Sequence, residues 1–158
     1  MDRIVFADAV AHHAMVTYSA LSAATATPTV LVVDDESSTQ LVLDRLLAFY
    51  RFTPLQAADL PEATTIAERE QVDAFIVDLK LGHGRSGLDM VEWVRQQQGY
   101  AAAPVFVLTS HRDIPDDVQT LIRQHRAHVF YKGHSLELLI DRLWQVLVDS
   151  ISAARAKM

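Results

Sequence analysis

Asp78 is the side chain best placed to act as a nucleophile, because it directly follows the apolar run Ala74 to Val77. Such a run is typical of a strand that is buried on both faces of a parallel sheet. Reactive groups in parallel sheets gather just beyond the carboxyl ends of the strands. An aspartate in this place can also simply cap a turn, so other parts of the chain have to decide between the two interpretations.

Three other apolar segments also end in polar side chains that could act on a charged ligand. They are residues 29–33 before Asp34 and Asp35, residues 104–108 before Thr109, and residues 128–131 before Lys132. If these strands are parallel and adjacent, three carboxylates, a hydroxyl and an ammonium group meet at one edge of the sheet. Mg²⁺ prefers oxygen ligands, and an ammonium group can neutralise a phosphoryl group. The sequence therefore predicts a site for Mg²⁺ and a phosphoryl group.

Helical patterns lie between these strands. Ser37 or Ser38 is expected to cap the first helix, and Asp59 is expected to cap a helix from Leu60 to Glu70. The segment Thr53 to Ala57 is a weaker strand, which we expect at a sheet edge because Pro54 lacks a backbone donor. Five strands that alternate with helices predict an α/β fold with a five-stranded parallel sheet, doubly wound by helices on both faces.

Length and composition exclude several classes of protein. The 158 residues suit one domain, and a hydrophobic content of 50% allows a sizeable core. The formal charge of −6 gives no basic surface, so we expect no direct binding to nucleic acid. No apolar run reaches the length of about 18 residues that a membrane span requires. The absence of cysteine fits a cytoplasmic location.

The two ends of the chain are expected to be appendages to the central domain. Residues 1–28 form an N-terminal extension, expected to be helical around Ile4 to Leu21; residues 29–150 form the domain; residues 151–158 are the end of a long C-terminal helix. Apolar residues cover about 200° of that last helix, more than the stripe of about 100° that a surface helix needs. We expect this face to be covered by a second copy of the chain, as a homodimer, or by residues 4–21.

Together, these segments resemble the receiver domain of two-component response regulators, a five-stranded doubly wound fold of the flavodoxin-like kind. The resemblance covers about residues 29–149 and rests on four segments in order: Val30-Leu31-Val32-Val33-Asp34-Asp35-Glu36, Val77-Asp78-Leu79 with Gly87-Leu88, Val107-Leu108-Thr109-Ser110, and Tyr131-Lys132. The resemblance implies that a sensor histidine kinase or a histidine phosphotransfer protein donates the phosphoryl group, and that an unknown downstream protein responds. It implies no catalysis beyond the domain's own phosphorylation and dephosphorylation.

The resemblance also assigns roles to single residues. Asp78 is expected to be phosphorylated, Asp34 and Asp35 to hold Mg²⁺ together with Asp78, Thr109 to contact the phosphoryl group, and Lys132 to be its counter-ion. The backbone carbonyl of Lys80 is the candidate for a further Mg²⁺ ligand. The side chains of Lys80 and His111 lie two residues beyond Asp78 and Thr109, so we expect them to affect the lifetime of the phosphoryl group.

Two positions depart from the receiver pattern. Receivers usually have a cis proline after the lysine, whereas Gly133 follows Lys132 here, so we expect a trans bond or a turn adapted to glycine. Receivers resembling this one use an aromatic switch residue three positions before the lysine, where this chain has Val129. A small β-branched side chain has little surface to move and a stiff χ1 torsion angle, so we expect a different conformational response.

Two other functions are compatible with parts of this pattern. Phosphatases of the haloacid dehalogenase kind also use an aspartate at the end of a strand, but they need a second aspartate two residues later, where this chain has Lys80. A degenerate receiver that binds a partner without being phosphorylated is the other alternative. The presence of all the charged site residues favours a phosphorylated receiver.

Overall fold

The computed structural model describes residues 12, 15–17, 27–81, 86–110 and 112–157. Contacts divide the chain into two compact units, residues 28–133 and a second unit of residues 1–27 with 134–158. The expected N-terminal helix around Ile4 to Leu21 lies largely outside the described residues, although residues 12 and 15–17 are helical. The domain boundaries expected from the sequence remain a prediction.

Residues 28–133 contain a five-stranded sheet in which every strand pair is parallel. The strand order is β2-β1-β3-β4-β5, so β1 (Thr29–Val33), β3 (Ala74–Asp78) and β4 (Val105–Thr109) are interior, while β2 (Thr53–Ala57) and β5 (His128–Tyr131) form the edges. This confirms the predicted parallel sheet and the edge position of the strand that carries Pro54. The strand order changes direction next to β1 and β3, and ligands of such folds bind outside the strand ends at that point.

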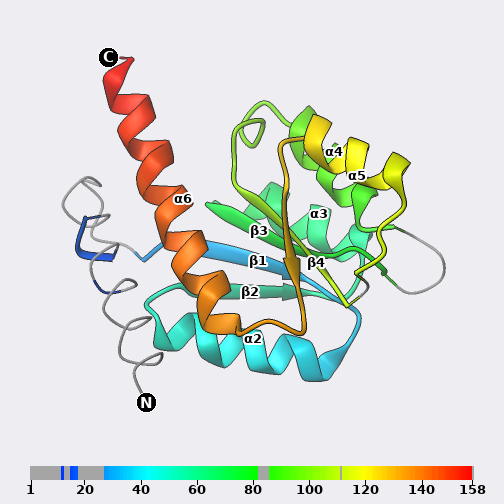
Figure 1. Cartoon of the computed structure of the whole chain (residues 1–158). Coiled ribbons are helices and arrows are strands. Elements are labelled where there is room, and N and C mark those ends of the chain that lie inside the picture. The colour runs from blue at the N-terminus through cyan, green and yellow to red at the C-terminus, as the bar shows by residue number, and fades with distance from the viewer. Residues whose placement is uncertain (1–11, 13–14, 18–26, 82–85, 111, 158) are drawn as a thin grey trace. The chain divides into compact units, whose positions relative to one another are not determined.

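Helices in this unit lie on both faces of the sheet (Figure 1). The helices α3 (Leu60–Arg69), α4 (Leu88–Gln96) and α5 (Asp116–Gln124) share one core cluster with alternate strand residues such as Phe75, Val77 and Val107. Helix α2 (Ser37–Phe49) packs against β1 and β2 and buries Leu43 and Leu47. Both β3 and β4 are interior strands and are buried on both faces, which explains why their sequences are continuous apolar runs.

The helix caps agree only partly with the sequence. Asp59 caps α3 as expected, because its Oδ1 accepts a hydrogen bond of 2.8 Å from the backbone nitrogen of Glu62. The expected serine cap of α2 is wrong: Glu36 is the N-cap residue, and Ser37 and Ser38 already belong to the helix. The turn is held from outside the helix, since Asp34 Oδ1 accepts a hydrogen bond from the Glu36 backbone nitrogen.

Helix α6 (Leu136–Ala156) belongs to the second unit. Its 21 residues confirm the long C-terminal helix, and six of its apolar side chains are buried: Leu139, Ile140, Leu143, Trp144, Leu147 and Val148. Ser135 is its N-cap residue, although the serine side chain makes no capping hydrogen bond to the backbone. None of the described helices is both long enough and apolar enough to cross a membrane.

Candidate phosphoryl and metal site

The first two carboxylates of the site follow β1. The backbone nitrogen of Asp34 donates a hydrogen bond of 3.0 Å to the carbonyl oxygen of Ala57, so the chain stays beside the end of β2 for one residue past β1. Asp34 is buried, and its Oδ1 accepts a hydrogen bond of 2.9 Å from the Glu36 backbone nitrogen. Asp35 is exposed. One carboxylate of the pair is thus fixed inside the molecule, and the next one faces solvent.

Asp78 is the last residue of β3, between β1 and β4. It is 92% buried, with a relative exposure of 8%. Its Oδ1 accepts a hydrogen bond of 3.2 Å from the Lys80 backbone nitrogen. The backbone nitrogen of the next residue, Leu79, donates to the carbonyl oxygen of Leu108, which extends the pairing of β3 with β4 beyond Asp78. The strand thereby holds the carboxylate at its rim while leaving a small part of it accessible.

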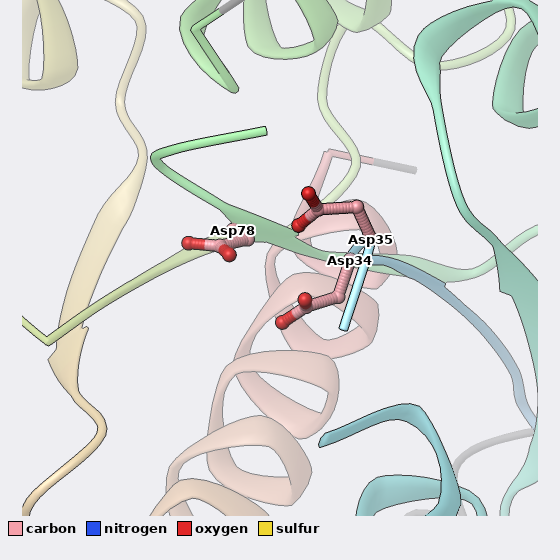
Figure 2. Close-up of side chains that lie close together, drawn as sticks. All are labelled: Asp34, Asp35 and Asp78. Carbon is pink, nitrogen blue, oxygen red and sulfur yellow. The ribbon is translucent and has the colours of Figure 1, made fainter. Parts of the chain in front are cut away.

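Figure 2 shows Asp34, Asp35 and Asp78 gathered where β1 and β3 end. Each of the three offers a carboxylate oxygen, and these oxygens lie within 4.8 Å of one another. Octahedral Mg²⁺ binds oxygen at about 2.0 to 2.1 Å, so neighbouring ligands are about 2.9 Å apart and opposite ligands about 4.2 Å apart. The three carboxylates therefore fit Mg²⁺ in chemistry, and oxygens as far apart as 4.8 Å would have to approach one another to share one ion.

Lys132, just after β5, brings an ammonium group to the same carboxylates. Its Nζ lies 3.2 Å from Asp34 Oδ2 and 3.2 Å from Asp78 Oδ2. Burial by itself would lower the pKa of Lys132, but the charges of Asp34 and Asp78 and their hydrogen bonds raise it above its ordinary value. The lysine therefore stays charged and partly neutralises the two buried carboxylates.

The pKa of Asp34 is raised above its ordinary value, chiefly because burial disfavours the charged form. The hydrogen bond from the Glu36 backbone nitrogen opposes this rise, while the negative charge of Asp78 adds to it. Lys132 lowers the pKa of Asp34, yet it does not cancel the rise. One ammonium group thus serves two buried carboxylates with an exposed third beside them, and further positive charge would relieve their repulsion.

The structure gives fewer contacts for the other predicted site residues, Thr109, Lys80 and His111. Thr109 is buried at the end of β4, and its carbonyl oxygen accepts a hydrogen bond of 2.9 Å from the Lys132 backbone nitrogen. The side chain of Lys80 is exposed at the rim, and the role of its carbonyl as a ligand stays a prediction. His111 lies outside the described residues. No cis peptide bond occurs in the part of the chain that the structure describes, which includes the bond between Lys132 and Gly133.

Two residues that support the site carry no charge and were not assigned a role from the sequence. Gly87 packs so closely on Asp78 that a Cβ atom at Gly87 would lie 2.0 Å from the Asp78 carbonyl oxygen. Gln40, in the first turns of α2, donates its side-chain amide to the carbonyl oxygens of Asp34 and Ala57. Gly87 belongs to a segment on which the receiver resemblance rests, whereas the only sequence signal for Gln40 is its short distance in the chain from a strand that ends in a carboxylate.

The sequence and the fold were compared with known proteins. The family model described as "Response regulator receiver domain" matches residues 30–143. A curated relative, the probable transcriptional regulator ycf27 of Porphyridium aerugineum, is 28% identical over 92 residues. That match covers 58% of this chain and 37% of the relative, so the chain spans well under half the length of the curated relative it matches.

Solved structures of receivers share the fold. Chemotaxis protein CheY4 of Vibrio cholerae superposes with a TM-score of 0.70 at 27% identity, covering 77% of this chain and 99% of CheY4. A response regulator of Burkholderia pseudomallei, solved with a phosphorylated aspartic acid and a calcium ion, gives a TM-score of 0.65 at 25% identity, covering 82% of this chain and 73% of its own. With the family model matching most of its length, this chain belongs to the response regulator receiver domain family.

Proposed function

We propose that Asp78 accepts a phosphoryl group in a Mg²⁺-dependent reaction, and that the phosphorylated domain controls a downstream protein. The observation that carries the proposal is the arrangement of three carboxylates with oxygens within 4.8 Å of one another and a lysine Nζ 3.2 Å from two of them. The B. pseudomallei response regulator, which was solved with a phosphorylated aspartic acid and a calcium ion, supports the same chemistry in a similar fold.

In the proposed transfer, residues of the chain supply the nucleophile and the groups that hold it in place. A carboxylate oxygen of Asp78 forms a bond to phosphorus as the bond from phosphorus to the donor nitrogen breaks, and the electron pair of that bond stays with the donor imidazole. Both oxygens of Asp78 are held beforehand, Oδ1 by the Lys80 backbone nitrogen and Oδ2 by Lys132. Fixed donors of this kind act on charge that develops during phosphoryl transfer.

Lys132 is proposed to neutralise the incoming phosphoryl oxygens, because its ammonium group already lies beside the attacking carboxylate. Thr109 is proposed to contact the phosphoryl group through its hydroxyl, since it ends the neighbouring strand β4. Mg²⁺, held by Asp34, Asp35 and Asp78 with the Lys80 carbonyl, would supply charge neutralisation between the nucleophile and the phosphoryl donor. The exposed side chain of Lys80, together with His111, is proposed to affect how long the phosphoryl group persists.

The proposed donor is a sensor histidine kinase or a histidine phosphotransfer protein, from which the receiver would accept the phosphoryl group in the cytoplasm. The alternative is a degenerate receiver that binds its partner without phosphorylation. A phosphorylated receiver and a degenerate receiver can be distinguished by measurement, because only the phosphorylated receiver needs Asp78 to react.

Intact-mass measurement after incubation with acetyl phosphate and Mg²⁺ tests the proposal. The wild type is expected to gain one phosphoryl group, and both Asp78→Asn and removal of Mg²⁺ by a chelator should abolish the gain. Asp113→Asn, which removes an exposed carboxylate, is the control and should react like the wild type. A gain that persists in Asp78→Asn would reject Asp78 as the acceptor, and a wild type that never gains mass would favour the degenerate receiver.

A further inference from the structure

Gln40 links the start of α2 to the carboxylates of the site. Its Nε2 donates one hydrogen bond of 2.5 Å to the carbonyl oxygen of Asp34 and one of 3.1 Å to the carbonyl oxygen of Ala57. A glutamine amide nitrogen carries two hydrogens, so these two contacts use its full capacity to donate. The side chain thereby joins the point where β1 ends to the point where β2 ends.

The same carbonyl of Ala57 also accepts the backbone nitrogen of Asp34 at 3.0 Å. Both polar groups of the Asp34 backbone are therefore engaged, its N–H by Ala57 and its C=O by Gln40. The Asp34 carboxylate is held separately by the Glu36 backbone nitrogen. Because the C=O of Asp34 belongs to the peptide unit that leads into Asp35, fixing it also limits how the exposed Asp35 side chain can be presented.

Gln40 is itself held by the sheet. Its backbone carbonyl oxygen accepts a hydrogen bond of 3.3 Å from Nε2 of Gln56, in β2, and its backbone nitrogen donates to the carbonyl oxygen of Glu36 at 3.1 Å. These contacts restrain the glutamine in the first turns of α2. The support for the Asp34 peptide thus comes from two elements, α2 and β2.

Such support matters because like charges at this edge repel one another. Asp35 is exposed, and a rotation of the Asp34–Asp35 peptide would move its carboxylate away from those of Asp34 and Asp78. A cation would then have to draw the three groups together again, at a cost to its own affinity. Groups that orient metal ligands through such contacts typically change metal affinity or activity by about 10- to 100-fold when they are removed.

We infer that Gln40 is a positioning residue, which holds the Asp34–Asp35 peptide so that the two carboxylates face Asp78 before a cation arrives. The inference rests on the proposed function, because it concerns the Mg²⁺ affinity of the same site. Gln40 touches neither the reacting atoms nor the cation, and it acts only through the main chain of Asp34.

Replacing Gln40 by methionine tests this inference, because methionine keeps a similar length and adds no charge but cannot donate. Titration calorimetry of the full chain with MgCl₂ should show the affinity of Gln40→Met about 10-fold weaker than that of the wild type. Gln97→Met is the matched control, since Gln97, the C-cap residue of α4, also donates its Nε2 to a backbone carbonyl, that of Trp93 at 3.2 Å. Its Mg²⁺ affinity should stay unchanged.

A second readout separates positioning from a general loss of stability. With acetyl phosphate, Gln40→Met should need about 10-fold more Mg²⁺ for half-maximal phosphorylation, while its rate at saturating Mg²⁺ should approach that of the wild type. If Gln40→Met does not fold, Gln40→Asn provides the same test, because its amide is one methylene too short to reach both carbonyls.

The outcomes distinguish this inference from the proposed function. A wild type that does not bind Mg²⁺ would reject the proposed function itself. If the wild type and Gln97→Met bind Mg²⁺ and the Gln40 variants bind it equally well, the positioning role is rejected while the proposed function stands. A lower free energy of unfolding for the Gln40 variants, with unchanged Mg²⁺ affinity, would likewise reduce Gln40 to a structural residue.

Discussion

Asp34 carries a cost that the rest of the site has to offset. It is almost fully buried, and it shares the ammonium group of Lys132 with Asp78. Burial raises its pKa, and the neighbouring charge of Asp78 raises it further. Without a bound cation, the charged form of this carboxylate is therefore less stable in the folded chain than it would be in water.

Asp34→Asn is expected to stabilise the chain in the absence of Mg²⁺. Because the pKa of Asp34 is higher in the folded state than the ordinary value of 3.8, its penalty is fully present above the folded pKa and disappears as the pH falls toward 3.8. Each kcal/mol shifts the melting temperature of a chain of this size by about 2 to 4 °C. Thermal unfolding in a chelator should thus show a higher melting temperature for the variant at pH 7 and little difference in acid.

Two comparisons complete that experiment. Asp113→Asn removes an exposed negative charge and should leave the melting temperature nearly unchanged. Saturating Mg²⁺ should stabilise the wild type more than Asp34→Asn, because the variant has lost a ligand. A variant that melts below the wild type at pH 7 without Mg²⁺ would show that the carboxylate contributes more through its hydrogen bonds than its burial costs.

Gly87→Ala is expected to impair Asp78 through main-chain displacement. A Cβ atom at residue 87 would lie 2.0 Å from the carbonyl oxygen of Asp78 and 2.9 Å from its carbonyl carbon, both of them backbone atoms. The end of β3 would have to move, and small displacements of a reacting group can reduce rates by about 100-fold. Phosphorylation by acetyl phosphate, followed by mass, should therefore slow markedly.

Gly99→Ala is the control for this substitution, since a Cβ atom there would have no neighbour within 4 Å. Its phosphorylation rate should match that of the wild type. Equal rates for both alanine variants would mean that the Asp78 backbone can shift without cost to the reaction.

The sequence was sufficient to predict which charged residues lie together at the candidate site, but not which residues hold them in place. Asp34, Asp78 and Lys132 follow apolar runs directly, and the geometry of parallel strands then brings them to one edge. Gln40 and Gly87 act through contacts with Ala57 and Asp78, which depend on how the chain folds rather than on a local pattern. A polar residue in the first turns of a helix or a glycine in a loop has too many ordinary explanations for its role to be predicted from one sequence.

At the scale of elements, the strands were predictable because their apolar runs are short and bounded by polar residues. The boundaries of β1, β2 and β5 coincide with the segments expected from the sequence. The start of α2 was not predictable from its serines, because the hydrogen bond between Asp34 Oδ1 and the Glu36 nitrogen starts the helix one residue earlier. The contact with Asp34 therefore determines where α2 begins, rather than the preference of serine for the N-cap position.

The conformational response to phosphorylation is expected to pass through β4 and the segment after it rather than through β5. Val129 is paired with Val107 and is 37% exposed, and Tyr131 is paired with Thr109. The small side chain of Val129 would bury little surface if it moved from an exposed to a buried position. The segment before α5 is instead attached to that helix, because Gln119 Nε2 donates to the carbonyl oxygen of Ile114 at 2.7 Å. Movement of Thr109 should therefore be passed on to α5.

Hydrogen exchange with and without beryllium fluoride, a phosphate mimic, measures this response. Protection should change in residues 109–117 and in α5, with little change in β5. Changes centred on residues 128–131, with residues 110–117 unaltered, would show that Phe130 and Tyr131 have taken over the switch. The Asp78→Asn variant treated in the same way shows which changes depend on the occupied site.

For the whole molecule, the homodimer through α6 remains a prediction, and the structure identifies an exposed residue of α6 at which to test it. Trp144 is 2% exposed, so a charge there would disturb the folded chain, whereas Leu138 is 53% exposed. Leu138→Glu should therefore weaken a dimer without unfolding the protein. Sedimentation over a range of concentrations should show a dimer for the wild type and a larger monomer fraction for this variant.

Leu41→Glu places the same charge at an equally exposed leucine, 52% exposed, on α2. This variant should sediment like the wild type if α6 forms the dimer contact. A wild type that is monomeric at every concentration would contradict the dimer and favour cover of the helix within one chain.

The ion pair between Lys132 and Asp34 joins residues that are 98 positions apart. A ribosome adds all the residues between them before the ammonium group can reach the carboxylates. A growing or truncated chain that stops short of β5 would hold the acceptor aspartate but not its counter-ion. The proposed phosphoryl acceptance by Asp78 therefore depends on residues up to Lys132 having been added, and a chain that ends earlier should accept the group poorly.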